Sequence, residues 1–171
     1  LLEKASNYTF SNYGLESINL PALISCGRGF SSGRNLKSIN VPLLDTVGDG
    51  AFEYCSSLTE ITLPSLRYTN GGLTFYYCSK LKKVALPKFG DITGITSDYD
   101  KNRYGQIMGN MFAYCSLLDT LIFRNSSRIV SLANKNAFTG TPIEKGTGYI
   151  YVPAALIDEY KTATNWTTFA N

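Results

Sequence analysis

Cysteine and histidine usage limits the chemistry open to this chain of 171 residues, which has four cysteines and no histidine. Without histidine, neither a Ser-His-Asp nor a Cys-His nucleophile arrangement can form within the chain. A zinc site needs closely spaced cysteine or histidine ligands, whereas Cys26, Cys55, Cys78 and Cys115 stand far apart in the sequence. The sequence therefore predicts neither nucleophilic catalysis nor a zinc centre.

A pair of carboxylates could also form a catalytic site, because glycoside hydrolysis needs two acidic side chains beside the scissile bond. Glu16, Glu60 and Asp119 fall at the edges of expected strands, but they are not in register with one another. Unpaired acidic residues of this kind are mostly solvated at the surface. We therefore expect no enzyme, and a carbohydrate-active enzyme fragment stands as an alternative.

The residues Asp98, Asp100 and Asn102 have the spacing that opens a calcium-binding loop. Arg103 stands where such a loop needs glycine for its sharp turn, and Gly109 stands where the bidentate glutamate belongs. The sequence also contains no phosphate-cradling glycine loop or dinucleotide fingerprint. No metal or other cofactor is therefore predicted.

A repeated phrase indicates how the chain positions its side chains. The pattern Leu-x-x-Ile-x-Leu-Pro, with related apolar residues in some copies, begins at Leu15, Leu36, Leu58 and Leu81, and it returns without the proline at Leu118. The first steps are about 22 residues long, which together with this pattern is the signature of a leucine-rich solenoid. The apolar residues should point inward, so the residues before and after the Ile face solvent. These outward residues are mostly Ser, Asn and Thr, which makes the strand face a weak candidate for binding.

Phenylalanine and cysteine also recur at fixed places before each strand phrase. Apolar residues at one repeat position stack on their copies and form a continuous core. Cys55, Cys78 and Cys115 share one such position, so we expect buried, unpaired thiols rather than disulfides. Cys26 lies outside this column and is also expected to be unpaired. The repeated phenylalanines are Phe10, Phe30, Phe52, Phe75, Phe112 and Phe138.

The cleanest copy of the repeat runs from Ala51 to Pro64, Ala-Phe-Glu-Tyr-Cys-Ser-Ser-Leu-Thr-Glu-Ile-Thr-Leu-Pro. It closely resembles the BspA-like leucine-rich repeats of bacterial surface proteins, and the resemblance covers nearly the whole chain. It implies a right-handed leucine-rich repeat solenoid of the α/β class, with short parallel strands and about six repeats of about 22 residues. We expect one domain over residues 1–171, with repeats over 1–143, an insertion at about 91–108 and a C-terminal helical cap over 144–171.

The same resemblance implies a function. The chain is expected to be a non-enzymatic protein-binding module of a bacterial cell-surface or secreted protein, which serves adhesion to host or neighbouring-cell proteins. Since it opens at Leu1 without an initiating Met, we interpret it as a mature segment. An extracellular or cell-surface location is inferred from the resemblance alone. The alternatives are a structural stalk that presents another domain and a phage tail-associated repeat.

Charge and hydropathy narrow the range of partners. The net charge is +3, only 17% of residues are charged, and the Lys and Arg residues are scattered. This distribution gives no electrostatic footprint for nucleic acid. No apolar run approaches the roughly 18 residues that a membrane-spanning helix needs. A monomer with a protein partner, without nucleic acid and without membrane insertion, is therefore expected.

The last step between strand phrases exceeds the others by about fifteen residues, which should form a loop that projects from the solenoid. This insertion brings together aromatic, basic and acidic residues, and Tyr and Arg are side chains that interfaces favour. The alternative is a passive loop, since long surface insertions cost little stability. The predicted partner-binding residues are Asp98, Tyr99, Asp100, Arg103 and Tyr104.

A helical cap is expected after the last strand. Pro153 suits a helix start, and residues 154–163 place apolar side chains on one face. That face should cover the open end of the core, as solenoids require for solubility. The residues expected to seal the core are Leu156, Ile157, Tyr160, Ala163, Trp166 and Phe169.

Overall fold

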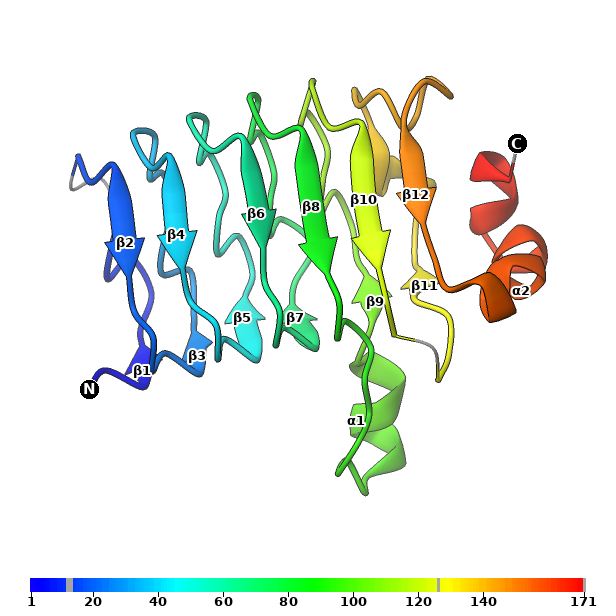
Figure 1. The fold of residues 1–171 in the computed structure, drawn as a ribbon, viewed down its shortest axis with the longest axis horizontal. Coiled ribbons are helices and arrows are strands. Elements are labelled where there is room, and N and C mark those ends of the chain that lie inside the picture. Colours follow the sequence, from blue (N-terminus) through cyan, green and yellow to red (C-terminus); the bar gives the residue numbers. More distant parts are fainter. Residues whose placement is uncertain (12–13, 126, 171) are drawn as a thin grey trace.

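The computed structural model describes residues 1–11, 14–125 and 127–170 and shows successive coils stacked along one axis (Figure 1). One long side of the stack carries the strands that the repeated phrase predicts. All pairings between these strands are parallel, and equivalent residues lie side by side, as in Ile61 beside Val84 and Val84 beside Leu121. The strands are β2 (Ser17–Asn19), β4 (Ser38–Asn40), β6 (Glu60–Thr62), β8 (Lys83–Leu86), β10 (Thr120–Phe123) and β12 (Tyr149–Tyr151).

A second row of short parallel strands forms the opposite side of the coils (Figure 1). The sequence analysis did not predict this row, because strands of two or three residues show no usable alternation. Its inward residues, such as Val47 and Ile107, are buried in the same core. The strands are β1 (Lys4–Ala5), β3 (Ser25–Cys26), β5 (Thr46–Gly48), β7 (Tyr68–Asn70), β9 (Gln106–Ile107) and β11 (Ser131–Leu132).

The inward and outward assignment of the strand phrase holds in the middle coils and fails in two places. Leu58 and Leu63 are fully buried, and Glu60 between them is exposed. Leu15, predicted to point inward, is 41% exposed, because no preceding coil packs against this first copy in the described chain. Ala85, predicted to face outward, is only 8% exposed, because its small side chain is shielded between flanking strands.

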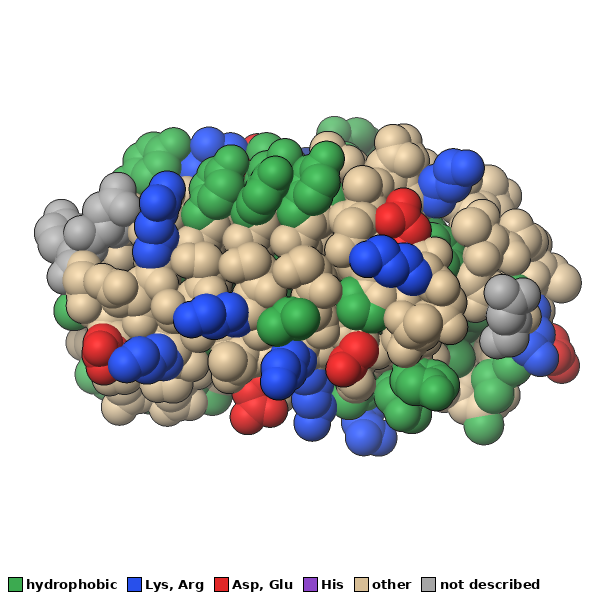
Figure 2. Space-filling view, turned by 90° about the horizontal axis from the view of Figure 1, so that it is seen from above, with side chains coloured by type: hydrophobic (Ala, Val, Ile, Leu, Met, Phe, Trp, Pro, Cys, Tyr) green, Lys and Arg blue, Asp and Glu red, His purple; other side chains and the backbone are tan. Residues whose placement is uncertain are grey.

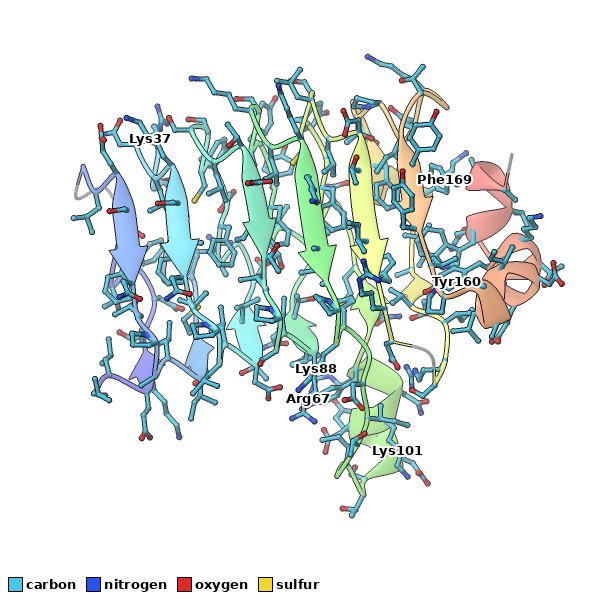
Figure 3. All side chains as sticks on the ribbon, in the orientation of Figure 1. Lys37, Arg67, Lys88, Lys101, Tyr160 and Phe169 are labelled. Atoms are coloured by element: carbon cyan, nitrogen blue, oxygen red, sulfur yellow. The ribbon has the colours of Figure 1, made fainter. Side chains whose placement is uncertain are left out.

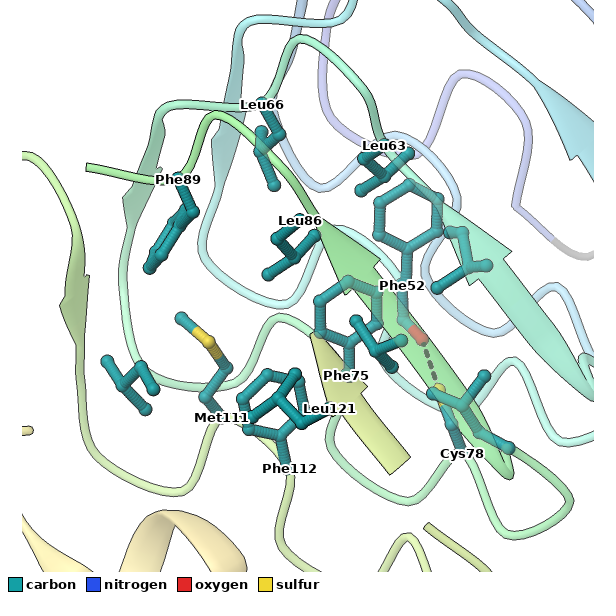
Figure 4. Close-up of a cluster of buried hydrophobic side chains, with 14 of the residues drawn as sticks. Phe52, Leu63, Leu66, Phe75, Cys78, Leu86, Phe89, Met111, Phe112 and Leu121 are labelled. Carbon is teal, nitrogen blue, oxygen red and sulfur yellow. Dashed lines mark hydrogen bonds between the residues drawn. The ribbon is translucent and has the colours of Figure 1, made fainter. Parts of the chain in front are cut away.

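The six repeated phenylalanines form one continuous stack through the core. Phe75 lies between Phe52 and Phe112, with ring centroids 5.4 Å and 5.5 Å away and nearly parallel planes (Figure 4). The stack continues to Phe10 at one end and Phe138 at the other. The prediction that residues at one repeat position stack on their copies is thereby confirmed.

The cysteine column runs beside the phenylalanine stack, and all four cysteines are unpaired and buried. The Cys78 thiol donates a hydrogen bond to the Phe52 carbonyl of the preceding coil at 3.0 Å (Figure 4). Cys55 and Cys115 repeat this bond, at 3.3 Å and 3.0 Å, to the carbonyls of Phe30 and Phe75. Each thiol therefore ties one coil to the last, a role that the sequence did not indicate.

We expect these thiols to resist alkylation in the folded protein, even at about pH 9, where an exposed cysteine is largely thiolate. Burial raises the pKa of Cys26 and Cys55 to about 12 and raises that of Cys78 well above its ordinary value. The protonated thiols stabilise the fold fully below the unfolded pKa of about 8.5, and this contribution is lost as pH rises toward about 12.

Mass spectrometry after iodoacetamide treatment without reductant measures this directly. The native protein should remain unlabelled, and the protein in urea should gain four adducts, one on each cysteine. A mass showing a linked pair, or rapid labelling of the native protein, would show that the column is not a set of buried thiols.

The insertion folds differently from the loop that the sequence predicted. Residues Asp98–Arg103 form helix α1, which projects beyond the neighbouring strands (Figure 1). Ser97 caps the helix by accepting a hydrogen bond from the Asp100 N–H, with acidic residues in the first turn and basic residues in the last. The expected boundary at 108 is also wrong, because Ile107 is fully buried in β9 and belongs to the solenoid.

Two glycines close the base of the insertion. Gly90 and Gly105 both have positive φ angles, +85° and +67°, and a Cβ atom on Gly105 would clash with the Gly90 Cα. The chain therefore leaves and re-enters the coil at nearly one point. The part that projects is the stretch 91–104, which is shorter than the predicted insertion.

The C-terminal cap comprises η2 (Ala154–Leu156), α2 (Ile157–Thr162) and η3 (Trp166–Phe169), and a further turn, η1 (Lys135–Phe138), carries the last stacked phenylalanine. Tyr160 and Trp166 are buried, as predicted. Ile157 is 38% exposed, since the 3-10 turn before α2 rotates this side chain away from the core. Over the described ranges, no helix combines the length and apolar character needed to cross a membrane.

Candidate functional site

The side chains predicted to bind a partner gather on α1 and on the coil beneath it. Arg103 reaches back to β7, where its guanidinium donates to the Tyr68 hydroxyl and, at 3.0 Å, to the Asn70 side-chain oxygen. The same guanidinium lies over two rings, 5.1 Å from the centroid of Tyr68 and 5.3 Å from that of Tyr99. Arg103 therefore joins α1 to the solenoid, and we call this set of contacts the clamp.

Tyr104 extends this clamp. Its ring stacks on Tyr68 with centroids 5.2 Å apart, and the Arg67 guanidinium lies over the Tyr104 ring, 5.5 Å from its centroid. Arg67 donates to the two carboxylate oxygens of Asp45 from Nε and Nη2, and its Nη1 donates to the Thr93 carbonyl at 3.0 Å. The hydrogen bonds that Arg67 donates to Asp45 raise the pKa of Arg67, so this cation stays charged.

A third arginine fixes the far end of α1. Arg128, from the next coil, donates to the carbonyls of Lys101 and Tyr104 at 3.0 Å and 2.7 Å. These carbonyls lie at the C-terminal end of α1, so a cation there also suits the negative end of the helix dipole. Figure 3 shows Arg67 and Lys88 at the base of the helix and Lys101 on it.

Few side chains of the insertion face solvent without contacting the solenoid. Tyr99 is 71% exposed, although the Arg103 guanidinium lies over its ring. Asp98 accepts a hydrogen bond from Lys101 at 2.9 Å, within the helix. Asp98 and Asp100 lie on α1 rather than in a loop, and the described residues hold no cluster of three or more acidic, Cys or His side chains suited to a metal.

A row of tyrosines forms a second surface feature, which the sequence analysis did not assign. Tyr54, Tyr77 and Tyr114 take left-handed φ angles of 58°, 59° and 63°, a conformation that glycine favours. Their rings stack at centroid distances of 5.4 Å and 4.6 Å, with Tyr76 edge-on to all three. Figure 2 shows apolar side chains in a row along one edge of the molecule.

The tyrosine row had a visible signal, because Tyr-Cys-Ser occurs three times in the sequence. Its exposure was not predictable from spacing, since the left-handed backbone turns the ring outward while the next residue, Cys, points inward. The same backbone position carries Ser32 and Gly140 in other coils, so only the middle coils contribute aromatic rings.

Comparison with protein families agrees with this architecture. The family model for the BspA type leucine rich repeat region matches in six copies over residues 3–99, and the chain belongs to this family. Among solved structures, it is similar to the T. pallidum leucine rich repeat protein, at 19% identity and a TM-score of 0.49. That match covers 75% of this chain, and the chain spans 65% of the length of the T. pallidum protein. No curated protein matches this chain significantly.

Proposed function

We propose that this chain is a non-enzymatic protein-binding module of a bacterial cell-surface or secreted protein, and that it serves adhesion to host or neighbouring-cell proteins. Membership of a leucine-rich repeat family supports a protein-interaction module in general. The observation that carries the proposal is the clamped insertion, in which three arginines hold a short helix off the solenoid with Tyr99 outward.

The physical reason is preorganisation. Binding costs free energy to order side chains and loops, and a segment already fixed in place avoids much of that cost. Arg103 and Tyr104 were predicted as direct contacts, and we assign them instead the task of holding α1. Tyr99 is then the main contact, because a rigid aromatic ring with a hydroxyl group supplies a large contact area. Asp98 and Asp100 frame it with negative charge.

We expect Tyr99→Ala to weaken adhesion by about tenfold or more, as truncation of a central interface tyrosine does. The assay is binding of the purified protein to immobilised extracellular matrix proteins and to whole cells. The matched control is Tyr8→Ala, because Tyr8 is 54% exposed and lies in the first coil, outside the insertion and outside the last strand.

Unchanged binding of Tyr99→Ala would contradict the assignment of the contact to α1. An equal loss of binding in Tyr8→Ala would also contradict it, because Tyr8 lies outside the insertion. Failure of the unmodified protein to bind any matrix protein or cell would count against adhesion itself.

A further inference from the structure

The two strand rows end differently beside the C-terminal cap. At the end of the second row, cap side chains bond to the backbone next to β11. Tyr160 accepts from the Val130 N–H at 2.8 Å, and the Trp166 indole donates to the Val130 carbonyl at 2.7 Å. Asn165 donates to the Leu132 carbonyl at 2.8 Å. The cap therefore satisfies the polar backbone at this edge of the solenoid.

Among the residues that the structure describes, none of the cap forms such a bond with β12, the last strand of the main row. In earlier coils, the N–H at the end of the strand phrase donates to the following strand, from Leu20 to the Asn40 carbonyl at 2.9 Å and from Leu63 to the Ala85 carbonyl at 3.0 Å. Val152 occupies the equivalent position after β12, and its N–H has no such bond within the described chain.

The hydrogen bonds of β12 lead to the same conclusion about its outer edge. The Tyr149 N–H donates to the Asp119 carbonyl of the preceding coil at 2.6 Å. Because successive residues of a strand point their polar groups to opposite sides, the N–H and carbonyl of Ile150 face the free edge. An edge of this kind is a template for another strand.

A groove follows this edge between β12 and the cap. It consists of two adjoining clefts of about 310 Å³ and 300 Å³, and Ile150 and Phe169 line both of them. Figure 3 shows Tyr160 and Phe169 on the cap beside the strand. Since the polar atoms of Tyr160 and Trp166 are bonded to Val130, these two side chains offer the groove mainly apolar ring surface.

We propose that this groove receives an extended segment of a partner protein, which adds to β12 as a further parallel strand. Only an extended backbone can accept from Val152 and pair with Ile150 in the register of the earlier coils. The segment would place an aliphatic residue, aligned with Ile150, into the cleft over Trp166 and Phe169. An acidic residue would suit the exposed Lys161 at the cleft. This proposal is independent of the contact assigned to Tyr99.

The probe is a synthetic peptide with the sequence of residues 57–64, Ser-Leu-Thr-Glu-Ile-Thr-Leu-Pro, because it is a clean copy of the strand phrase and carries an acidic residue. The peptide lacks tryptophan, so the emission of Trp166, the one tryptophan of the chain, reports on the groove. We expect a saturable change in emission at up to about 1 mM peptide, together with slower amide exchange at Ile150 and Val152. A peptide with Asp in place of its Ile should bind at least about tenfold more weakly.

The groove variant is Ile157→Lys, because Ile157 lines the cleft and is partly exposed, so the core stays intact. It should weaken peptide binding by about tenfold, whereas Leu43→Lys, at a 51% exposed site outside the groove, should not. Thermal melts of both variants verify folding. Unchanged Trp166 emission and unchanged exchange would overturn the proposal, as would equal binding by Ile157→Lys. Protection that grows with protein concentration, without peptide, would assign the groove to a second copy and also overturn it.

Discussion

Replacing Phe75 by alanine is expected to destabilise the protein by about 3–5 kcal/mol, the cost of removing a fully buried phenylalanine. Phe75 is the middle ring of the stack, in contact with Phe52 on one side and Phe112 on the other. Its loss leaves a cavity that the rigid coils cannot close, because each neighbour is itself fixed by the next ring. Urea denaturation with a two-state fit gives the free energy of unfolding.

Glu60→Ala is the control for this measurement, since Glu60 lies on the exposed side of β6. The expected change is within about 0.5 kcal/mol, as for most surface substitutions. Phe52→Ala should behave like Phe75→Ala, because Phe52 is also fully buried between two rings. Equal losses for Phe75→Ala and Glu60→Ala would mean that the inward and outward sides of the coil are wrongly assigned.

Gly105→Ala is expected to be the second most damaging of the substitutions considered, at about 2–4 kcal/mol. Two costs combine at this position. The φ angle of +67° disfavours any residue with a Cβ atom, and that atom would also clash with the Gly90 backbone. Because backbone atoms of a packed coil cannot move aside easily, the base of the insertion must open.

Gly94→Ala separates the two costs. Gly94 has a φ angle of +79°, but a Cβ atom there would meet nothing within 4 Å. We expect a loss of about 1 kcal/mol, from the backbone conformation alone. Thermal unfolding of both variants gives the comparison, and equal melting temperatures would show that Gly90 and Gly105 do not close the insertion.

The main strand row and the phenylalanine stack could be predicted because they repeat. Leu58, Ile61 and Leu63 recur with their equivalents at nearly constant spacing, so one packing solution serves every coil. The second row of strands has no such repeated residue pattern. Strands such as Ser25–Cys26 are defined by backbone pairing with their neighbours and carry no pattern of their own.

The contacts that the insertion makes could not be predicted from the sequence. Tyr99, Arg103 and Tyr104 were predicted together as a binding group, but their spacing could not distinguish contacts with a partner from contacts with the solenoid. The residues that decide this, Tyr68 and Arg128, come from the preceding and the following coil and meet α1 only in the folded chain. The helix itself had a local signal in the Ser97 cap, which the apparent calcium spacing of Asp98 and Asp100 obscured.

The most direct test of the insertion as contact surface is a binding measurement on a chain that lacks Asp91–Tyr104. Gly90 and Gly105 lie close enough to be joined by one peptide bond, which spans about 3.8 Å between Cα atoms. The account predicts that this shortened chain unfolds cooperatively, as the parent does, and no longer adheres to the matrix proteins or cells that the parent binds. A folded, shortened chain that adheres as tightly as the parent would contradict it.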